Sequence, residues 1–379
     1  MKVSRNRIKN SIIINKSIEG IHCLRCDGRN VINGICSDCH NDGSPLYYTD
    51  REIKNKNHIV KMRFELSPRQ QKASHYFLEL LKKKESGVLY AVCGSGKTEI
   101  MYESILFALN NHMKACFAIP RKEIVKELSE RLKKVFIKTT ISALYENSHN
   151  DEGELIVSTV HQLINYDNEF DLIILDEADA FPFYKNEYLN RILRRALKKS
   201  GSLFMMSATL SDFSSNNILI ISRRYHNEIL DKPSLIIDKK FSLDNLDSLN
   251  KIIDNTDRKI IIYTKSIKDS TRLSRILNVP SVNSKKEIKE TLNSFRKSKD
   301  RIIVSTTILE RGVTFSNLDV IVINAENEVF NKETLIQICG RVGRTMNDRH
   351  GNIYFISKEK MIKFYLVNKY IEKMNKYEM

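Results

Sequence analysis

The segment Ala91–Thr98 (AVCGSGKT) has the residue types and spacing of a loop that binds nucleotide phosphates. Gly94 and Gly96 let the backbone turn tightly, so that amide N–H groups can point at an anion. Lys97 supplies a positive charge for the β- and γ-phosphates, and the hydroxyl of Thr98 can reach Mg²⁺. The segment therefore predicts a site for ATP and Mg²⁺.

Two adjacent carboxylates, Asp176 and Glu177, directly follow the apolar run 172–175. Ligands of open α/β sheets gather at the carboxyl ends of strands, which is where this pair is expected. Hydrolysis of ATP needs one carboxylate to hold magnesium and another group to orient or deprotonate the attacking water. Asp176 fits the first role and Glu177 the second.

Two arginines near the C-terminal end, Arg341 and Arg344, are spaced so that they share one helical face or loop edge. A rigid guanidinium near the γ-phosphate stabilises the charge that develops during phosphoryl transfer. If a second domain supplies these arginines, hydrolysis depends on closure of the two domains around the nucleotide.

Four cysteines form two CxxC pairs separated by nine residues: Cys23, Cys26, Cys36 and Cys39. Two such pairs can complete a tetrahedron around Zn²⁺, and a full set of ligands indicates a structural rather than a catalytic metal. Gly28 and Gly34 are expected to provide the turns between the pairs. His22 and His40 flank the cluster and could replace a thiolate, although surface positions suit them better.

The chain of 379 residues is long enough for two domains and a small appendage, and it carries a net charge of +16. Charges of both signs are interspersed, so the excess favours a folded protein that binds a polyanion such as nucleic acid. No apolar stretch approaches the about 18 residues of a membrane span. The clustered cysteines favour a reducing cytoplasm over a disulfide framework. The isolated cysteines are expected to be small buried hydrophobic residues: Cys93, Cys116 and Cys339.

Apolar runs that alternate with helical patterns predict parallel sheets covered on both faces, in two successive α/β domains. The strands expected in the first domain are Val88–Val92, Ala115–Ile119, Glu154–Thr159, Leu172–Leu175 and Leu203–Ser207. Those expected in the second are Lys259–Tyr263, Arg301–Val304, Asp319–Asn324 and Asn352–Ile356. The expected helices are Glu99–Leu109, Ser266–Leu277, Lys285–Ser298 and Thr334–Cys339.

These patterns divide the chain into a zinc module at 18–45, a first domain at 62–220, a second domain at 221–357 and a C-terminal helix at 358–379. The polar stretch 41–57 is expected to be a linker. The C-terminal helix, rich in Lys and Glu, is expected to be a solvated surface helix.

The ordered set of motifs over residues 62–357 resembles superfamily 2 helicases and translocases. The resemblance implies two tandem RecA-like domains with ATP between them. It implies that Ser207–Thr209 links hydrolysis to strand movement. It also implies that Arg341 and Arg344 belong to the superfamily's motif VI. It implies an adenine-reading role for Gln70, with Gln71 as the alternative in this register. The nucleotide and Mg²⁺ residues it implies are Gln70, Gly94, Ser95, Gly96, Lys97, Thr98, Glu99, Asp176 and Gln337.

A four-cysteine module ahead of such a core narrows the resemblance to the ComFA family of late-competence ATPases. Three segments carry it: Ala91–Glu99, Asp176–Pro182 and Thr306–Phe315. The resemblance implies a nucleic-acid-stimulated ATPase that moves single-stranded DNA into the cytoplasm during natural competence. It also implies partners among competence proteins below a membrane DNA channel and a cytoplasmic location against the inner face of the membrane, and it leaves self-association open.

By the same resemblance, the DNA backbone would lie across both domains without sequence readout, near Arg121, Thr159, Lys265 and Thr307. Two other interpretations stay open. One is a superfamily 2 helicase that remodels RNA or restarts replication. The other is a zinc-ribbon binding protein whose ATP site acts only as a switch, which the intact pairs of carboxylates and arginines disfavour.

Overall fold

The computed structural model describes residues 11–14, 16–49, 53, 57–146, 152–209, 215–282, 291, 294–295, 300–310 and 315–377. The chain divides into two compact units. The first comprises Met1–Tyr90 and Lys97–Ile220, and the second comprises Ala91–Gly96 and Ile221–Met379. Most of the expected helix 285–298 and residues 311–314 of the segment 306–315 lie outside the described residues.

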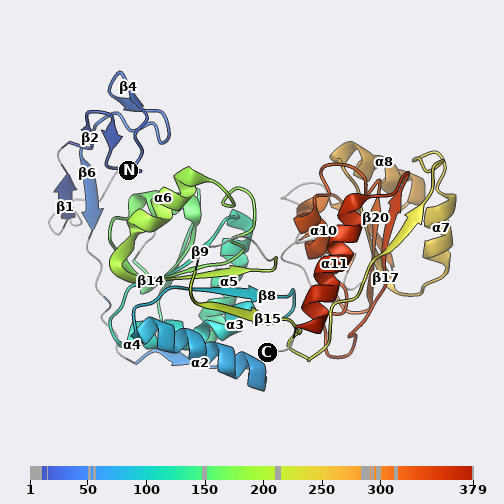
Figure 1. The fold of residues 1–379 in the computed structure, drawn as a ribbon, viewed down its shortest axis with the longest axis horizontal. Coiled ribbons are helices and arrows are strands. Elements are labelled where there is room, and N and C mark those ends of the chain that lie inside the picture. The colour runs from blue at the N-terminus through green and yellow to red at the C-terminus, as the bar shows by residue number, and fades with distance from the viewer. Residues whose placement is uncertain are drawn as a thin grey trace. The chain divides into compact units, whose positions relative to one another are not determined.

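The first unit contains a seven-stranded sheet (Figure 1). Its strands, in order of neighbours, are β11 (Ile141–Leu144), β12 (Leu155–Thr159), β9 (Ala115–Ile119), β13 (Phe170–Leu175), β14 (Leu197–Ser207), β8 (Gly87–Ala91) and β15 (Ile218–Ile221). The pairings from β11 through β8 are all parallel, so the carboxyl ends of these strands share one edge. Every residue of β8, β9 and β12 is buried, which explains their uninterrupted apolar sequences. The five expected strands are confirmed, whereas β11 and β15 were not expected.

Helices cover both faces of this sheet. They are α2 (Pro68–Lys82), α3 (Lys97–Ile100), α4 (Tyr102–Asn110), α5 (Lys122–Val135) and α6 (Glu187–Ala196), with a 3₁₀ helix η1 (Val160–Asn165). The crossovers through α4 and α5 run along the sheet in one direction and those through η1 and α6 run in the other. Right-handed crossovers therefore place the two pairs on opposite faces, and Figure 1 shows α6 and α4 on either side of the strands.

Short antiparallel ribbons form the N-terminal module. They pair β2 (Ile18–Glu19) with β3 (His22–Cys23), and β4 (Val31–Ile32) with β5 (Ile35–Cys36). A third ribbon pairs β1 (Ser11–Ile14) with β6 (Leu46–Thr49). The expectation of a linker at 41–57 is therefore wrong over β6, because the sequence LYYT within that polar stretch pairs with β1. A further ribbon joins β7 (Ile59–Val60) to β10 (Phe136–Ile137).

The second unit contains a six-stranded parallel sheet. Its strands, in order, are β16 (Ser234–Ile237), β21 (Ile353–Ser357), β20 (Leu318–Ile323), β17 (Lys259–Tyr263), β19 (Ile302–Ser305) and β18 (Ser281–Val282). Its helices are α7 (Asp247–Asp254), α8 (Ile267–Leu277), α10 (Lys332–Cys339) and α11 (Ile362–Lys376), with a 3₁₀ helix η2 (Thr307–Glu310). The four expected strands are confirmed to within a residue, whereas β16 and β18 were not expected.

The C-terminal helix is more buried than its composition indicates. Helix α11 packs against α10 and buries Val367, Tyr370, Ile371 and Met374. The expectation of a solvated surface helix is therefore wrong for one face, whose apolar residues recur at helical spacing between the lysines. Among the described residues, no helix combines the length and the apolar character that crossing a bilayer requires.

Candidate functional site

The expected phosphate loop follows β8 and leads into α3. Gly94 and Gly96 have φ angles of +83° and +78°, a left-handed conformation that glycine adopts without strain. Ser95 is buried, and its amide nitrogen donates to the carbonyl of Val92 over 3.1 Å. Lys97 is the first residue of α3. This loop is therefore suited to a nucleotide phosphate, which the backbone amides of such a turn would bind.

The two carboxylates lie where the sequence predicts, directly after β13. The amide of Asp176 donates to Ala118 of the neighbouring strand over 3.0 Å. The amide of Glu177 donates to Asp176 Oδ1 over 2.8 Å, and Glu177 has a left-handed φ of +54°. Only β14 separates β13 from β8, so this pair lies on the same sheet edge as Lys97 and Thr98.

A hydrogen bond that the sequence did not reveal joins the carboxylate motif to the end of β14. Thr209 Oγ1 donates to Asp179 Oδ2 over 2.7 Å, and both side chains are buried. Ser207 Oγ donates to the carbonyl of Thr209 over 2.6 Å and accepts from its amide over 3.1 Å. The segment 207–209 is therefore fixed to the segment 176–179. Both motifs could be found in the sequence, but nothing in their spacing predicted that Thr209 and Asp179 meet.

Gln70 has a structural contact in addition to its predicted role. Its Oε1 accepts a hydrogen bond from the amide of Ser67 over 2.8 Å, in a capping box at the start of α2. The alternative residue, Gln71, donates its side-chain amide to Leu66 over 2.8 Å. Glu99 in α3 lies 3.9 Å from Arg131 Nη1. Adenine recognition by Gln70 stays a prediction.

In the second unit, the two predicted arginines lie on a turn that follows α10. We call residues 340–344 the arginine loop. Gln337 is buried in the last turn of α10. Arg341 is only 2% exposed, whereas Arg344 is half-buried and its Nε donates to the carbonyl of Gly340 over 2.5 Å. Gly343 between them has a φ of +62°. The pair shares a loop edge rather than a helical face, and its action on a bound nucleotide stays a prediction.

The expected nucleic-acid residues lie at strand ends in both units. Arg121 follows β9, and Thr159 ends β12, which is the neighbour of β9. In the second unit, Lys265 follows β17 and is exposed, and Thr307 follows the neighbouring strand β19. In each unit, therefore, the two candidates lie at the carboxyl ends of adjacent parallel strands.

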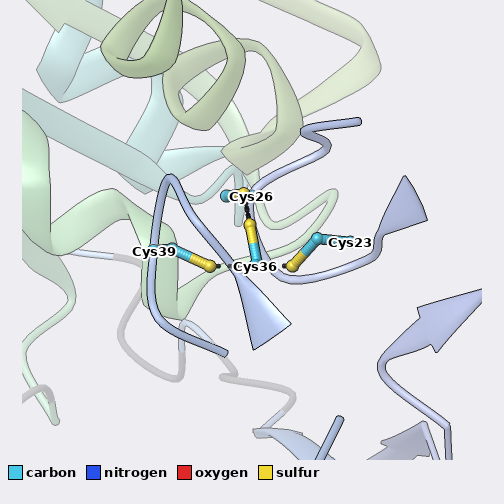
Figure 2. A group of neighbouring side chains, drawn as sticks. All are labelled: Cys23, Cys26, Cys36 and Cys39. Carbon is cyan, nitrogen blue, oxygen red and sulfur yellow. Dashed lines mark hydrogen bonds between the residues drawn. The ribbon is translucent and has the colours of Figure 1, made fainter. Parts of the chain in front are cut away.

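The four cysteines converge at the N-terminal module (Figure 2). Cys23 Sγ lies 3.6 Å from Cys39 Sγ, Cys26 Sγ lies 3.6 Å from Cys36 Sγ, and all four atoms lie within 4.8 Å of one another. Tetrahedral Zn–S bonds of about 2.3 Å separate the sulfurs by about 3.8 Å, so the cluster fits Zn²⁺. A hydrogen bond with Cys39 and burial raise the pKa of the Cys26 thiol above its ordinary value, an effect that a bound cation opposes.

The residues around the cluster refine the sequence interpretation. His22 Nε2 lies 2.7 Å from Asp27 Oδ1. Neither His22 nor His40 belongs to the cluster that the described residues form. Gly34 provides the expected turn, with a φ of +75° between β4 and β5. Gly28 has a different role, because a Cβ there would lie 2.6 Å from Asp38 Oδ2 and 3.1 Å from Cys26 Sγ. It allows close packing rather than a left-handed turn.

The module packs against α6 and η1 of the first unit. Arg191 Nη2 forms an ion pair with Asp38, and Arg195 Nη1 donates to the carbonyl of Arg25 over 2.6 Å. The cysteine cluster also contacts Ile164 and Tyr188. Burial, with a smaller contribution from the nearby thiols, raises the pKa of Tyr188 to about 12. The cysteine cluster is thus part of the first unit's packing, next to the 3₁₀ helix that follows Thr159.

Comparison with known proteins identifies two helicase regions and two similar relatives. The family model described as "Type III restriction enzyme, res subunit" matches residues 63–212, and "Helicase conserved C-terminal domain" matches residues 244–346. The chain is 31% identical to "Competence protein ComFA" of Bacillus subtilis, over 97% of this chain and 88% of that protein. It is 33% identical to "Competence protein ComFA" of Streptococcus pneumoniae, over 87% of this chain and 82% of that protein.

Solved structures support the fold. The yeast structure "S. cerevisiae Dbp5 bound to RNA and ADP BeF3" has a TM-score of 0.58 at 18% identity, over 82% of this chain and 92% of that one. "Structure of Mycobacterium smegmatis helicase Lhr bound to ssDNA and AMP-PNP" has a TM-score of 0.57 at 15% identity, over 82% of this chain and 48% of that one. The chain therefore has two tandem RecA-like domains with an N-terminal four-cysteine module, which confirms the predicted fold class.

Proposed function

Because the chain belongs to the ComFA family, we propose that it is an ATP-driven motor that moves single-stranded DNA during the uptake of transforming DNA. Its helicase domains make it an ATP-hydrolysing, helicase-like enzyme. Movement along single-stranded DNA is a more specific activity than ATP hydrolysis by a helicase-like enzyme, and the arrangement of the first unit supports it.

The observation that supports it best is the shared strand edge of the first unit. Lys97 and Asp176 follow β8 and β13, and Arg121 and Thr159 lie at the ends of β9 and β12. Nucleotide and nucleic-acid candidates therefore occupy neighbouring positions on one sheet. Movement of the segments after these strands, driven by the nucleotide, would reach the residues that hold the DNA backbone. The net charge of +16 favours backbone phosphates as the partner.

Each residue has a defined role in the proposed hydrolysis. The phosphate loop and Lys97 would bind the β- and γ-phosphates of ATP, and Thr98 with Asp176 would hold a Mg²⁺ ion, which would supply positive charge beside those phosphates. Glu177 orients the attacking water and accepts its proton. Arg341 and Arg344 act on the γ-phosphate after the domains close. Ser207–Thr209 transmits the state of the carboxylate motif to the end of β14.

We assign the four thiolates to a structural Zn²⁺, because a complete set of ligands leaves no position for substrate. Because the module lies against η1, which follows Thr159, its exposed face would extend the surface for DNA, or for a competence protein at the cytoplasmic side of a DNA channel. Binding at the inner face of the membrane would then depend on such a partner.

The deciding experiment measures steady-state ATP hydrolysis during titration with single-stranded DNA, duplex DNA and RNA of matched length. We expect single-stranded DNA to give the largest stimulation, and Lys97→Ala to show none. Stimulation by RNA alone would favour RNA remodelling instead. Binding of ATP without turnover would favour the switch model.

A further inference from the structure

The connector that opens the second unit carries an arginine that no motif explains. Residues 222–233 join β15 to β16, and Arg224 lies near the start of this connector. The side chain of Arg224 is 0% exposed. A guanidinium keeps its charge at this depth, so its surroundings must provide acceptors.

One nitrogen of Arg224 holds the arginine loop. Its Nη1 donates to the carbonyl of Gly343 over 2.6 Å and to that of Arg349 over 3.1 Å. His226 Nε2, from the same connector, also lies 3.1 Å from the Gly343 oxygen. A Cβ on Gly343 would lie 2.1 Å from Arg224 Nη1, so only glycine permits this approach. Arg224 therefore positions the turn that carries Arg341 and Arg344.

The other two nitrogens of Arg224 lack acceptors. Nε and Nη2 are buried, and neither has a hydrogen-bond partner among the residues that the structure describes. The carboxylate of Asp231 lies 3.5 Å from Nη1 and does not serve this edge. Burial lowers the pKa of Arg224 below its ordinary value, and Arg344 adds like-charge repulsion. A buried donor edge without a partner is unfavourable, so its geometry favours binding of an anion.

Residues 91–96 of the phosphate loop belong to the same unit as Arg224 and lie beside it. The amide of Tyr225 donates to the carbonyl of Gly94 over 2.9 Å. A Cβ on Gly94 would lie 3.7 Å from Cγ and 3.8 Å from Cδ of Arg224. The aliphatic part of Arg224 therefore lies against the backbone of the phosphate loop, and a phosphate oxygen bound there is an acceptor of the kind that the Nε and Nη2 edge lacks in the described part of the chain.

We propose that Arg224 is a nucleotide-binding arginine that contacts a phosphate oxygen through Nε and Nη2 while Nη1 holds the arginine loop. It thus joins the presence of nucleotide to the position of Arg341 and Arg344. The inference rests on the proposed ATPase function and adds a residue that lies outside the motifs at the strand ends.

The test is equilibrium binding of a fluorescent ATP analogue with Mg²⁺ in the absence of nucleic acid, with unlabelled ATP and tripolyphosphate as competitors. We expect Arg224→Gln to weaken binding of all three by about tenfold or more, as loss of a charge-assisted contact implies. Arg224→Lys keeps the charge without the paired donors, and we expect an intermediate loss. Thermal unfolding of both variants identifies those that remain folded.

Two controls separate binding from structure. Arg223→Gln removes the neighbouring charge, whose Nη2 donates to the carbonyl of Asn375 over 3.4 Å, and should bind ATP as the wild type does. His226→Ala loosens Gly343 without touching the Arg224 edge, so we expect a lower kcat and an unchanged dissociation constant. Wild-type affinity in folded Arg224→Gln and Arg224→Lys would overturn the inference alone. A wild type that binds no ATP would overturn the proposed function as well.

Discussion

The hydroxyl of Thr209 donates a hydrogen bond to the buried carboxylate of Asp179, with 2.7 Å between Thr209 Oγ1 and Asp179 Oδ2. The second oxygen of Asp179, Oδ1, is also buried and has no hydrogen-bond partner within the described part of the chain. Removal of the Thr209 hydroxyl would therefore take away the hydrogen bond that Asp179 Oδ2 accepts, while Oδ1 already lacks one among the described residues. This bond joins two segments that the sequence separates by thirty positions.

Thr209→Val should lower the free energy of unfolding of the first unit by about 1–3 kcal/mol, because it removes a buried hydrogen bond to a charged group. Thr209→Ser keeps the donor and should remain close to the wild type. Chemical denaturation of the three proteins measures the difference. Equal stability of the valine and serine variants would show that the bond does not contribute.

Lys97→Ala and Glu177→Gln should both abolish ATP turnover, for different reasons. The lysine variant loses the cation that binds the phosphates, so its affinity for nucleotide should fall. The glutamine variant keeps the expected magnesium ligand Asp176, so ATP should still bind. Nucleotide binding and phosphate release measured on the same preparations distinguish the two. A wild-type hydrolysis rate in Glu177→Gln would remove that residue from the mechanism.

Arg344→Ala should lose most of the DNA-stimulated ATP hydrolysis while both units stay folded. Loss of an arginine finger typically lowers the rate by about 10³-fold or more. The exposed Arg275 on α8 offers a matched control, since Arg275→Ala removes the same charge away from the arginine loop. Stimulated rates and circular dichroism of both variants provide the test. Full stimulation of Arg344→Ala would argue against a role for this arginine across a closed cleft.

The paired substitutions Cys36→Ser and Cys39→Ser should release the metal and unfold the module, because two of four ligands are lost. Ile164 and Tyr188 contact the cluster, so the thermal midpoint of the first unit should fall as well. Basal ATP hydrolysis should remain measurable, and binding of DNA or of a protein partner should weaken. Metal analysis should give one zinc per chain in the wild type and none in the double variant. His22→Ala, outside the cluster, should keep its zinc; a zinc-free wild type would refute the site.

The ion pair between Arg191 and Asp38 should hold the module on α6 without holding the metal. We expect Arg191→Ala to keep zinc but to speed amide hydrogen exchange in residues 22–40. A double-mutant cycle with Asp38→Ala should give a coupling of about 0.5–3 kcal/mol, as contacting residues do. Additive effects of the two substitutions would show that the pair does not fix the module.

The sequence by itself determined the elements whose signals are local. Buried parallel strands need apolar side chains on both faces, so runs such as Ala115–Ile119 and Lys259–Tyr263 were predicted at their observed bounds. The two CxxC pairs likewise predicted the cluster, because a closed tetrahedral metal site needs four ligands and two short CxxC pairs can supply them. The short strand β6 (LYYT) lies within a polar stretch that obscured its signal, and it pairs with β1, a partner more than thirty residues away.

Only the tertiary structure decided which side chains meet. The bond between Asp179 and Thr209, the packing of the zinc module through Arg191, and the contact of Arg224 with Gly343 each join distant parts of the chain. An arginine among many basic residues has no sequence feature that marks it as buried. The role proposed for Arg224 rests on the burial of its side chain, on its hydrogen bond to the Gly343 carbonyl and on the donors Nε and Nη2, which are unpaired within the residues that the structure describes. An unpartnered charge is costly only where water is excluded.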